Sequence, residues 1–174
     1  VDTLVYWGGS SGEGLIVPPS PDVVDAAHKN GVRVLGTVFM PQTAHGGKME
    51  WLEDLLVKNE DGSYPVADKL IEVAQTYGFE GWFMNQETEG TDEEPLTADH
   101  AARMQQFIQY FKEQAPDLDL VYYDSMTVDG KMDWQNALTE ENLAYLVSED
   151  GDPVADAMFL NFWWTPDPLP IRNF

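Results

Sequence analysis

GFEGWFMNQETEG, residues 78–90, is an apolar run that ends in an amide and a carboxylate two positions apart. Side chains alternate along a strand, so Phe83, Asn85 and Glu87 are expected on one face of it. A strand that stays apolar on both faces until its last residues is typical of a parallel sheet covered by helices. Functional groups in such sheets lie at the carboxyl ends of the strands. We therefore expect chemistry at Asn85 and Glu87.

Three interpretations of this strand end are open. The polar residues could simply solvate the end of the strand, with Glu89 continuing into an acidic loop. The carboxylates could instead gather a hard cation such as calcium, although the loop lacks the spacing of a known calcium motif. The third interpretation is glycoside chemistry, in which Glu87 is a proton donor and Asn85 holds an acetamido group of the substrate.

The rest of the chain predicts strands and helices in alternation. The expected strands are residues 1–7, 32–40, 79–87, 118–124 and 157–164, and the expected helices are 21–30, 49–57, 66–77, 97–114 and 139–147. This order predicts a single α/β domain with a parallel sheet and right-handed crossovers. A (β/α)₈ barrel is the natural completion, but such barrels take about 250 residues. Five strands in 174 residues therefore predict a partial TIM barrel.

Composition argues against several partners. Thirty-one acidic and nine basic residues give a net charge of −22, which repels nucleic acid and anionic bilayers. No apolar run of about 18 residues suggests membrane insertion. The chain has no cysteine, and His28, His45 and His100 form no metal or relay motif. We expect no metal and no other cofactor, and we expect His45 to be a solvated loop residue.

Residues 78–90 resemble the signature of the endo-β-N-acetylglucosaminidases of glycoside hydrolase family 85, with its Asn-x-Glu pair. Similar blocks follow in the family's order: VLGTVFMP at 34–41, GGKMEWLEDLL at 46–56, VYYDSM at 121–126, WQNAL at 134–138 and MFLNFWW at 158–164. The resemblance covers essentially the whole chain. It implies that residues 1–174 are an incomplete (β/α)₈ glycosidase catalytic domain, roughly its second to sixth β/α units.

The resemblance also implies roles for three residues. Glu87 matches the general acid/base, which protonates the leaving oxygen and then deprotonates water. Asn85 matches the residue that holds the 2-acetamido group of the substrate while its oxygen attacks the anomeric carbon, giving an oxazoline intermediate. Tyr123 matches a site tyrosine whose hydroxyl supports Asn85 or the intermediate, although a role as a core or lip aromatic is the alternative.

Aromatic residues are the candidates for substrate binding. Trp134 and one of Trp163 or Trp164 resemble platforms that stack on a sugar face, with core packing as the alternative interpretation. Tyr6 or Trp7 stands at the carboxyl end of the first expected strand, and Phe83 shares a face with Asn85. We include Trp7 and Phe83 as substrate-binding candidates.

The resemblance implies a retaining endo-glycosidase that cleaves the N,N′-diacetylchitobiose core of N-linked glycans on glycoproteins. One rival is a two-carboxylate glycosidase that uses Glu87 with Asp124, but neighbours on a strand point apart, so Tyr123 and Asp124 cannot both face the site. Another rival is an inactive carbohydrate-binding barrel fragment. By the same resemblance the expected location is extracellular or at the cell surface, with the cytoplasm as the alternative.

Overall fold

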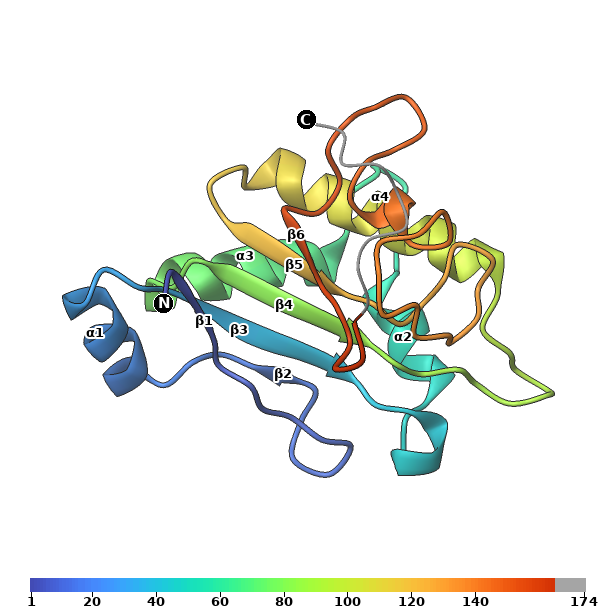
Figure 1. The fold of residues 1–174 in the computed structure, drawn as a ribbon, viewed down its shortest axis with the longest axis horizontal. Helices are drawn as coiled ribbons and strands as arrows, with labels where there is room; N and C mark the ends of the chain where they lie inside the picture. Colours follow the sequence, from blue (N-terminus) through green and yellow to red (C-terminus); the bar gives the residue numbers. More distant parts are fainter. Residues whose placement is uncertain (165–174) are drawn as a thin grey trace.

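The structure is a computed structural model that describes residues 1–164, built around one twisted sheet (Figure 1). Five strands are parallel and lie in the order β1-β3-β4-β5-β6. Their bounds are Thr3–Val5 for β1, Arg33–Met40 for β3, Gly81–Gln86 for β4, Asp119–Tyr123 for β5 and Ala157–Phe159 for β6. This arrangement confirms the expected partial barrel. The first and last strands are shorter than predicted, since residues 1–7 and 157–164 were expected to be extended throughout.

One strand was not predicted. β2, Ile16–Val17, pairs antiparallel with β3 and joins Ile16 to Val38. It occupies the carboxyl-terminal half of the β3 edge whose amino-terminal half pairs with β1. A two-residue strand has no alternation to reveal it, because a period of two needs about four residues to be visible.

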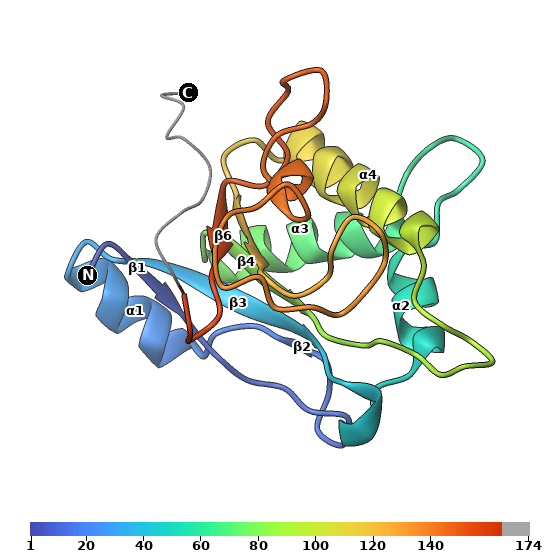
Figure 2. The same ribbon diagram turned by 45° about the vertical axis from the view of Figure 1, so that its right-hand side comes forward.

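Four α-helices of the described residues accompany the sheet (Figure 2): α1 is Pro21–Lys29, α2 is Met49–Leu55, α3 is Pro65–Tyr77 and α4 is Ala98–Gln114. The largest side chain of the core between helices and sheet is Trp82, which is fully buried. Its indole Nε1 donates to the carbonyl of Leu70 at 3.0 Å, so the one polar atom of this ring is satisfied inside the core. No helix within residues 1–164 has the length and apolar character needed to cross a membrane.

The helix predicted over residues 139–147 is wrong. The structure has only a 3₁₀ turn there, η2, Leu143–Tyr145. Asn142 explains the difference, because its side chain accepts from the Thr139 N–H at 2.8 Å and donates to the carbonyl of Ala137 at 2.9 Å. An asparagine that bonds to nearby backbone in this way favours a turn over a helix. A second 3₁₀ turn, η1, Thr43–His45, lies in the loop after β3.

The other face of the sheet carries the site. The register sets Phe39 beside Asn85 and Tyr123 beside Phe159. Phe83 lies one layer below Asn85. The centroid of its ring is 6.0 Å from that of Tyr123 and 5.2 Å from that of Phe159. Figures 1 and 2 show long loops gathered where β3, β4 and β5 end. An aromatic floor therefore lies beneath the carboxyl ends of the strands, and its rings include Phe39, Phe83, Tyr123 and Phe159.

Candidate active site

Glu87 is the first residue after β4, and the backbone around it is held from both sides. Its N–H donates to the carbonyl of Met40 at 2.8 Å, which continues the ladder with β3. The buried side chain of Gln86 donates to the carbonyl of Thr88 at 2.8 Å and accepts from the Thr88 N–H at 3.1 Å. The turn that carries Glu87 is thus fixed by main-chain and side-chain bonds, which is how a rigid scaffold presents a functional group.

The carboxylate of Glu87 is half-buried and has one side-chain partner among the described residues. Gln42 Nε2 donates to Glu87 Oε2 at 3.1 Å. Sequence reasoning did not select Gln42, although it lies in the loop that follows β3, at the same end of the sheet. This position at the carboxyl end of a strand was the signal in the sequence that could have identified Gln42.

Asn85 lies two residues before Glu87, and its side chain is 3% exposed. Its Oδ1 accepts no hydrogen bond from any residue that the structure describes. A buried amide oxygen without a donor costs about 1–3 kcal/mol. A ligand N–H that reached this oxygen would remove that cost, so the geometry of Asn85 suits recognition of an amide.

Tyr123 ends β5 beside these two residues. Its hydroxyl donates to Asn161 Oδ1 at 2.9 Å. Burial raises the pKa of Tyr123 to about 12, and the neighbouring Glu87 carboxylate adds to the shift. Tyr123 is therefore a neutral phenol at physiological pH. Asn161 was also not selected from the sequence, although it follows Phe159 by two positions and so continues the same face.

Asp124 is a buried carboxylate, and both of its oxygens accept hydrogen bonds. It accepts from the backbone N–H of Gln135 at 3.1 Å and of Asn136 at 2.7 Å, and from Asn142 Nδ2 at 3.1 Å. These bonds hold the loop after β5. The carboxylate is thus engaged in loop structure, away from the face that carries Tyr123.

Trp134 lies in a different setting from Trp163 and Trp164. Trp134 is half-buried and lines a hollow of about 520 Å³ together with Gln42 and five other residues, which are Glu89, Leu96, Gly130, Lys131 and Met132. Trp163 and Trp164 are 80% and 67% exposed. The hollow adjoins Glu87 through Gln42, so Trp134 is the tryptophan that shares a space with the acid's hydrogen-bond partner.

Trp7 and Phe83 belong to the aromatic floor. Trp7 is 55% exposed and packs on Phe39 at 5.2 Å and on Phe83 at 5.8 Å. Phe83 is only 3% exposed. Trp7 therefore offers a ring face to a ligand, whereas Phe83 supports the rings around it.

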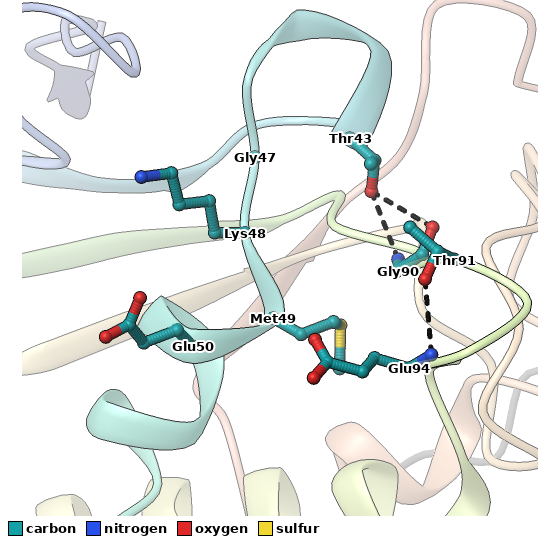
Figure 3. A pocket seen from close by; sticks show the side chains of 8 residues that line it. All are labelled: Thr43, Gly47, Lys48, Met49, Glu50, Gly90, Thr91 and Glu94. Atoms are coloured by element: carbon teal, nitrogen blue, oxygen red, sulfur yellow. Dashed lines mark hydrogen bonds between the residues drawn. The ribbon is translucent and has the colours of Figure 1, made fainter.

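A second hollow, of about 270 Å³, lies between the loop after β3 and the loop after β4 (Figure 3). Thr43 Oγ1 bonds to both the N–H and the carbonyl of Gly90, and Thr91 Oγ1 accepts from the Glu94 N–H at 3.2 Å. None of its lining residues was predicted for the site. Asn85, Glu87 and Tyr123 are absent from its lining, so it is separate from the carboxylate.

The three histidines lie apart from each other. His45 is exposed in η1, as predicted. His28 Nε2 contacts Glu80 at 2.9 Å, and His100 Nε2 contacts Glu53 at 2.6 Å. Within residues 1–164, no three His, Asp or Glu side chains are grouped in a way that could hold a metal ion.

Comparison with known proteins places these residues in a family. The model of glycosyl hydrolase family 85 matches residues 1–172. Cytosolic endo-β-N-acetylglucosaminidase 2 of Arabidopsis thaliana is 33% identical, with 94% of this chain and 21% of that protein covered. The cytosolic endo-β-N-acetylglucosaminidase of Mus musculus is 32% identical, with 97% of this chain and 21% of that protein covered. The crystal structure of the glycoside hydrolase domain of Endo-D from Streptococcus pneumoniae is 36% identical with a TM-score of 0.79, and 94% of this chain covers 25% of that one.

The curated relatives also correct one expectation. The relatives from Arabidopsis thaliana, Mus musculus and Homo sapiens are all named cytosolic enzymes, so the predicted extracellular or cell-surface location is wrong. The chain spans about a fifth of the length of these curated relatives. The match of the family model along residues 1–172 and the shared parallel half-barrel lead to one conclusion: the chain belongs to glycosyl hydrolase family 85.

Proposed function

We propose that residues 1–174 form part of the (β/α)₈ catalytic domain of an endo-β-N-acetylglucosaminidase. The proposed substrates are N-linked glycans of glycoproteins, cleaved within the N,N′-diacetylchitobiose core with retention. Family membership and the names of the relatives support the activity. Their names also favour a cytosolic setting for the reaction.

One observation carries the mechanism: Asn85 Oδ1 is buried and accepts from no donor within residues 1–164, two residues before Glu87. An acetamido group at C2 of the sugar carries an N–H that Asn85 Oδ1 can accept. Held in this way, the acetamido carbonyl oxygen attacks the anomeric carbon, and the bond to the leaving oxygen breaks. The product of this step is a cyclic oxazolinium ion, which keeps its N–H bonded to Asn85 Oδ1, and the substrate itself has supplied the nucleophile.

Glu87 supplies and recovers the proton. In the first step its carboxyl group gives a proton to the leaving oxygen, and in the second its carboxylate takes a proton from the water that opens the oxazolinium ring. Gln42 Nε2 donates to one oxygen of this group at 3.1 Å and so orients it through both steps. The carboxyl group is returned to its starting state, and the anomeric centre, inverted twice, keeps its configuration.

The two-carboxylate rival has less support. Asp124 is buried and accepts three hydrogen bonds from residues 135–142. To act as a nucleophile it would have to leave those donors unpaired, and each such loss costs about 1–3 kcal/mol.

The decisive experiment compares two substrates in the complete enzyme that contains residues 1–174, which is called the full-length chain below. The pair differs only at C2 of the cleaved sugar, with an acetamido group in one and a hydroxyl in the other. In the proposed mechanism the hydroxyl substrate lacks the nucleophile, so its turnover should stop. Comparable rates on the two substrates would refute the role of Asn85, and binding of both without any product would identify a carbohydrate-binding barrel.

A synthetic oxazoline donor isolates the first step. Asn85→Ala should lose about 10²–10³-fold on intact glycans, the usual cost of removing one aimed hydrogen-bonding group. The same variant should still transfer the preformed oxazoline to an acceptor, because Glu87 remains to activate the acceptor hydroxyl. Equal losses on both donors would show that Asn85 does not act in oxazoline formation.

A further inference from the structure

Three hydrogen bonds, called the relay below, connect the Tyr123 hydroxyl to the backbone of Trp134 through the side chains of two asparagines. The Tyr123 hydroxyl bonds to Asn161 Oδ1 at 2.9 Å, and Asn161 Nδ2 bonds to Asn136 Oδ1 at 2.9 Å. Asn136 Nδ2 then bonds to the carbonyl oxygen of Trp134 at 2.8 Å. The relay links a strand end with the loop that carries the predicted platform.

The backbone of Asn136 is fixed at an unusual conformation. Its φ is 56°, and it is the one non-glycine residue with a positive φ among those that the structure describes. Its N–H donates to Asp124 Oδ2 at 2.7 Å, which holds the residue there. Left-handed conformations of this kind cost about 1–3 kcal/mol and persist where surrounding contacts enforce them. The buried Asp124 carboxylate thus fixes the backbone of Asn136. This fixed backbone positions the side chain for its bonds to Asn161 and Trp134.

The last acceptor determines the direction of every bond in the relay. A backbone carbonyl can only accept, so the NH₂ group of Asn136 must face Trp134 and its Oδ1 must face Asn161. Asn161 then has to present its NH₂ group to Asn136 and its Oδ1 to Tyr123. Tyr123 must therefore donate its proton to Asn161.

We propose that Asn136 and Asn161 are positioning residues that commit the Tyr123 proton to the protein and tie Tyr123 to the Trp134 loop. Asp124 anchors this relay. Tyr123, whose phenol is neutral, then turns oxygen lone pairs rather than its proton toward the bound sugar. Through the relay, a displacement of Trp134 by substrate also shifts the Tyr123 hydroxyl. This proposal rests on the proposed function for its catalytic meaning.

The first test is a double-mutant cycle on kcat in the full-length chain. Asn161→Ala should reduce kcat about three- to tenfold, the equivalent of one ordinary hydrogen bond. If Asn161 acts through the Tyr123 hydroxyl, the same substitution should cost less than about twofold in a Tyr123→Phe background. A purely structural role for Asn161 predicts equal losses in both backgrounds, and that result would overturn the relay.

Asn136→Gly tests the link to Trp134. Glycine adopts a positive φ without strain, so this substitution removes the side-chain amide and keeps the backbone conformation. It should lower kcat as Asn161→Ala does and also raise KM, because the Trp134 loop loses a bond. Asn59→Ala is the control, since Asn59 bonds only within an exposed turn through Ser63, and neither constant should change. A drop in kcat without a rise in KM would refute the link.

Backbone hydrogen exchange provides a test that is independent of turnover. Amides of residues 134–142 should exchange faster in Asn161→Ala and faster still in Asn136→Gly, because each substitution removes bonds that hold this loop. If exchange in this segment stays at the parent rate, the relay is wrong. If the parent enzyme cleaves no chitobiose glycan, the proposed function fails, and the exchange result still decides the relay.

Discussion

At the scale of the residue, Asn85 and Glu87 are prepared differently for a substrate. Glu87 already accepts a hydrogen bond from Gln42, so its orientation is set. Asn85 Oδ1 is buried with no donor from the described residues, so it is open to a donor from outside them, such as a bound ligand. The difference matches the proposed roles, because a proton donor must be aimed in advance, whereas the amide needs an open acceptor for the incoming acetamido N–H.

We predict that Glu87→Gln in the full-length chain lowers kcat by about 10²–10⁴-fold on natural glycopeptides, the usual contribution of general acid–base catalysis. The amide is isosteric and can still bond with Gln42, so the fold should be preserved in circular dichroism and thermal melting. Glu93→Gln, the same change at an exposed loop position, should have no effect on kcat. Retention of kcat within about threefold of the parent by Glu87→Gln would contradict the assignment.

Tyr123 gives a prediction about pH. Its folded pKa of about 12 lies above the ordinary tyrosine value of 10.0. Folded and unfolded states bind the same proton below about pH 10, so Tyr123 makes no pH-dependent contribution there. Between about pH 10 and 12 the Tyr123 phenol ionises in the unfolded state but not in the folded state. The free energy of unfolding therefore falls as pH rises through the folded pKa.

The corresponding experiment is the pH profile of kcat in the parent and in Tyr123→Phe. Because the phenol stays neutral below about pH 10, the basic limb of the profile should lie at the same pH in both proteins, whatever the drop in rate. A basic limb that disappeared in Tyr123→Phe would show that Tyr123 titrates in the working range.

At the scale of the element, alternation along the strands was enough to place the pair at residues 85 and 87. The apolar spacing of 98–114 was enough to predict α4, because both signals are local in the sequence. Gln42 and Asn161 were missed for the opposite reason. Each meets its partner across about forty residues of chain, at 45 residues for Gln42 and Glu87 and 38 for Asn161 and Tyr123. Only the register of the sheet brings such residues together.

The false helix at 139–147 shows the same limit. A threonine before an apolar run is a fair cap signal, but Asn142 and Asp124 bind the backbone and side chains of this segment instead. Asp124 is 18 residues away from Asn142, so the competing contact is invisible to a local pattern. Tertiary hydrogen bonds overrode the local preference here.

The strand pair β4–β5 depends on a glycine, and we predict its substitution to be damaging. Gly81 has a φ of +142°, and a Cβ built there would lie 1.9 Å from the backbone oxygen of Asp119. Gly81→Ala therefore combines strain with a clash against backbone that cannot move without breaking the strand pairing. We expect the free energy of unfolding to fall by more than about 3 kcal/mol.

Gly31→Ala separates these two effects. Gly31 also has a positive φ, +67°, but a Cβ there would meet nothing within 4 Å. Strain alone should cost about 1–2 kcal/mol at this position. Denaturant unfolding of both variants, made in the full-length chain, measures the difference, and equal losses would mean that β5 moves aside without penalty.

At the scale of the whole molecule, the half-barrel has one covered and one uncovered face. Helices cover the face that contains Trp82, whereas the face with the site carries Trp7 at 55% exposure and Phe159 at 42%. The outer edges of β1 and β6 pair with no further strand among residues 1–164. In a closed barrel these edges pair and the inward side chains fill the interior. Both features support the proposal that residues 1–174 are part of a larger catalytic domain.

We predict that residues 1–174 produced alone aggregate and show no turnover. The open edges present unpaired backbone groups to other chains, and the exposed rings add apolar surface that promotes association. Size-exclusion chromatography and calorimetry should show large species without a cooperative transition, and the release of glycans from a glycopeptide should be absent. The full-length chain, assayed in parallel, should elute as a defined species and be active. A monomeric, cooperatively melting and active preparation of residues 1–174 would contradict the partial-barrel assignment, because a half-barrel with one uncovered face cannot exclude water from the reacting bond.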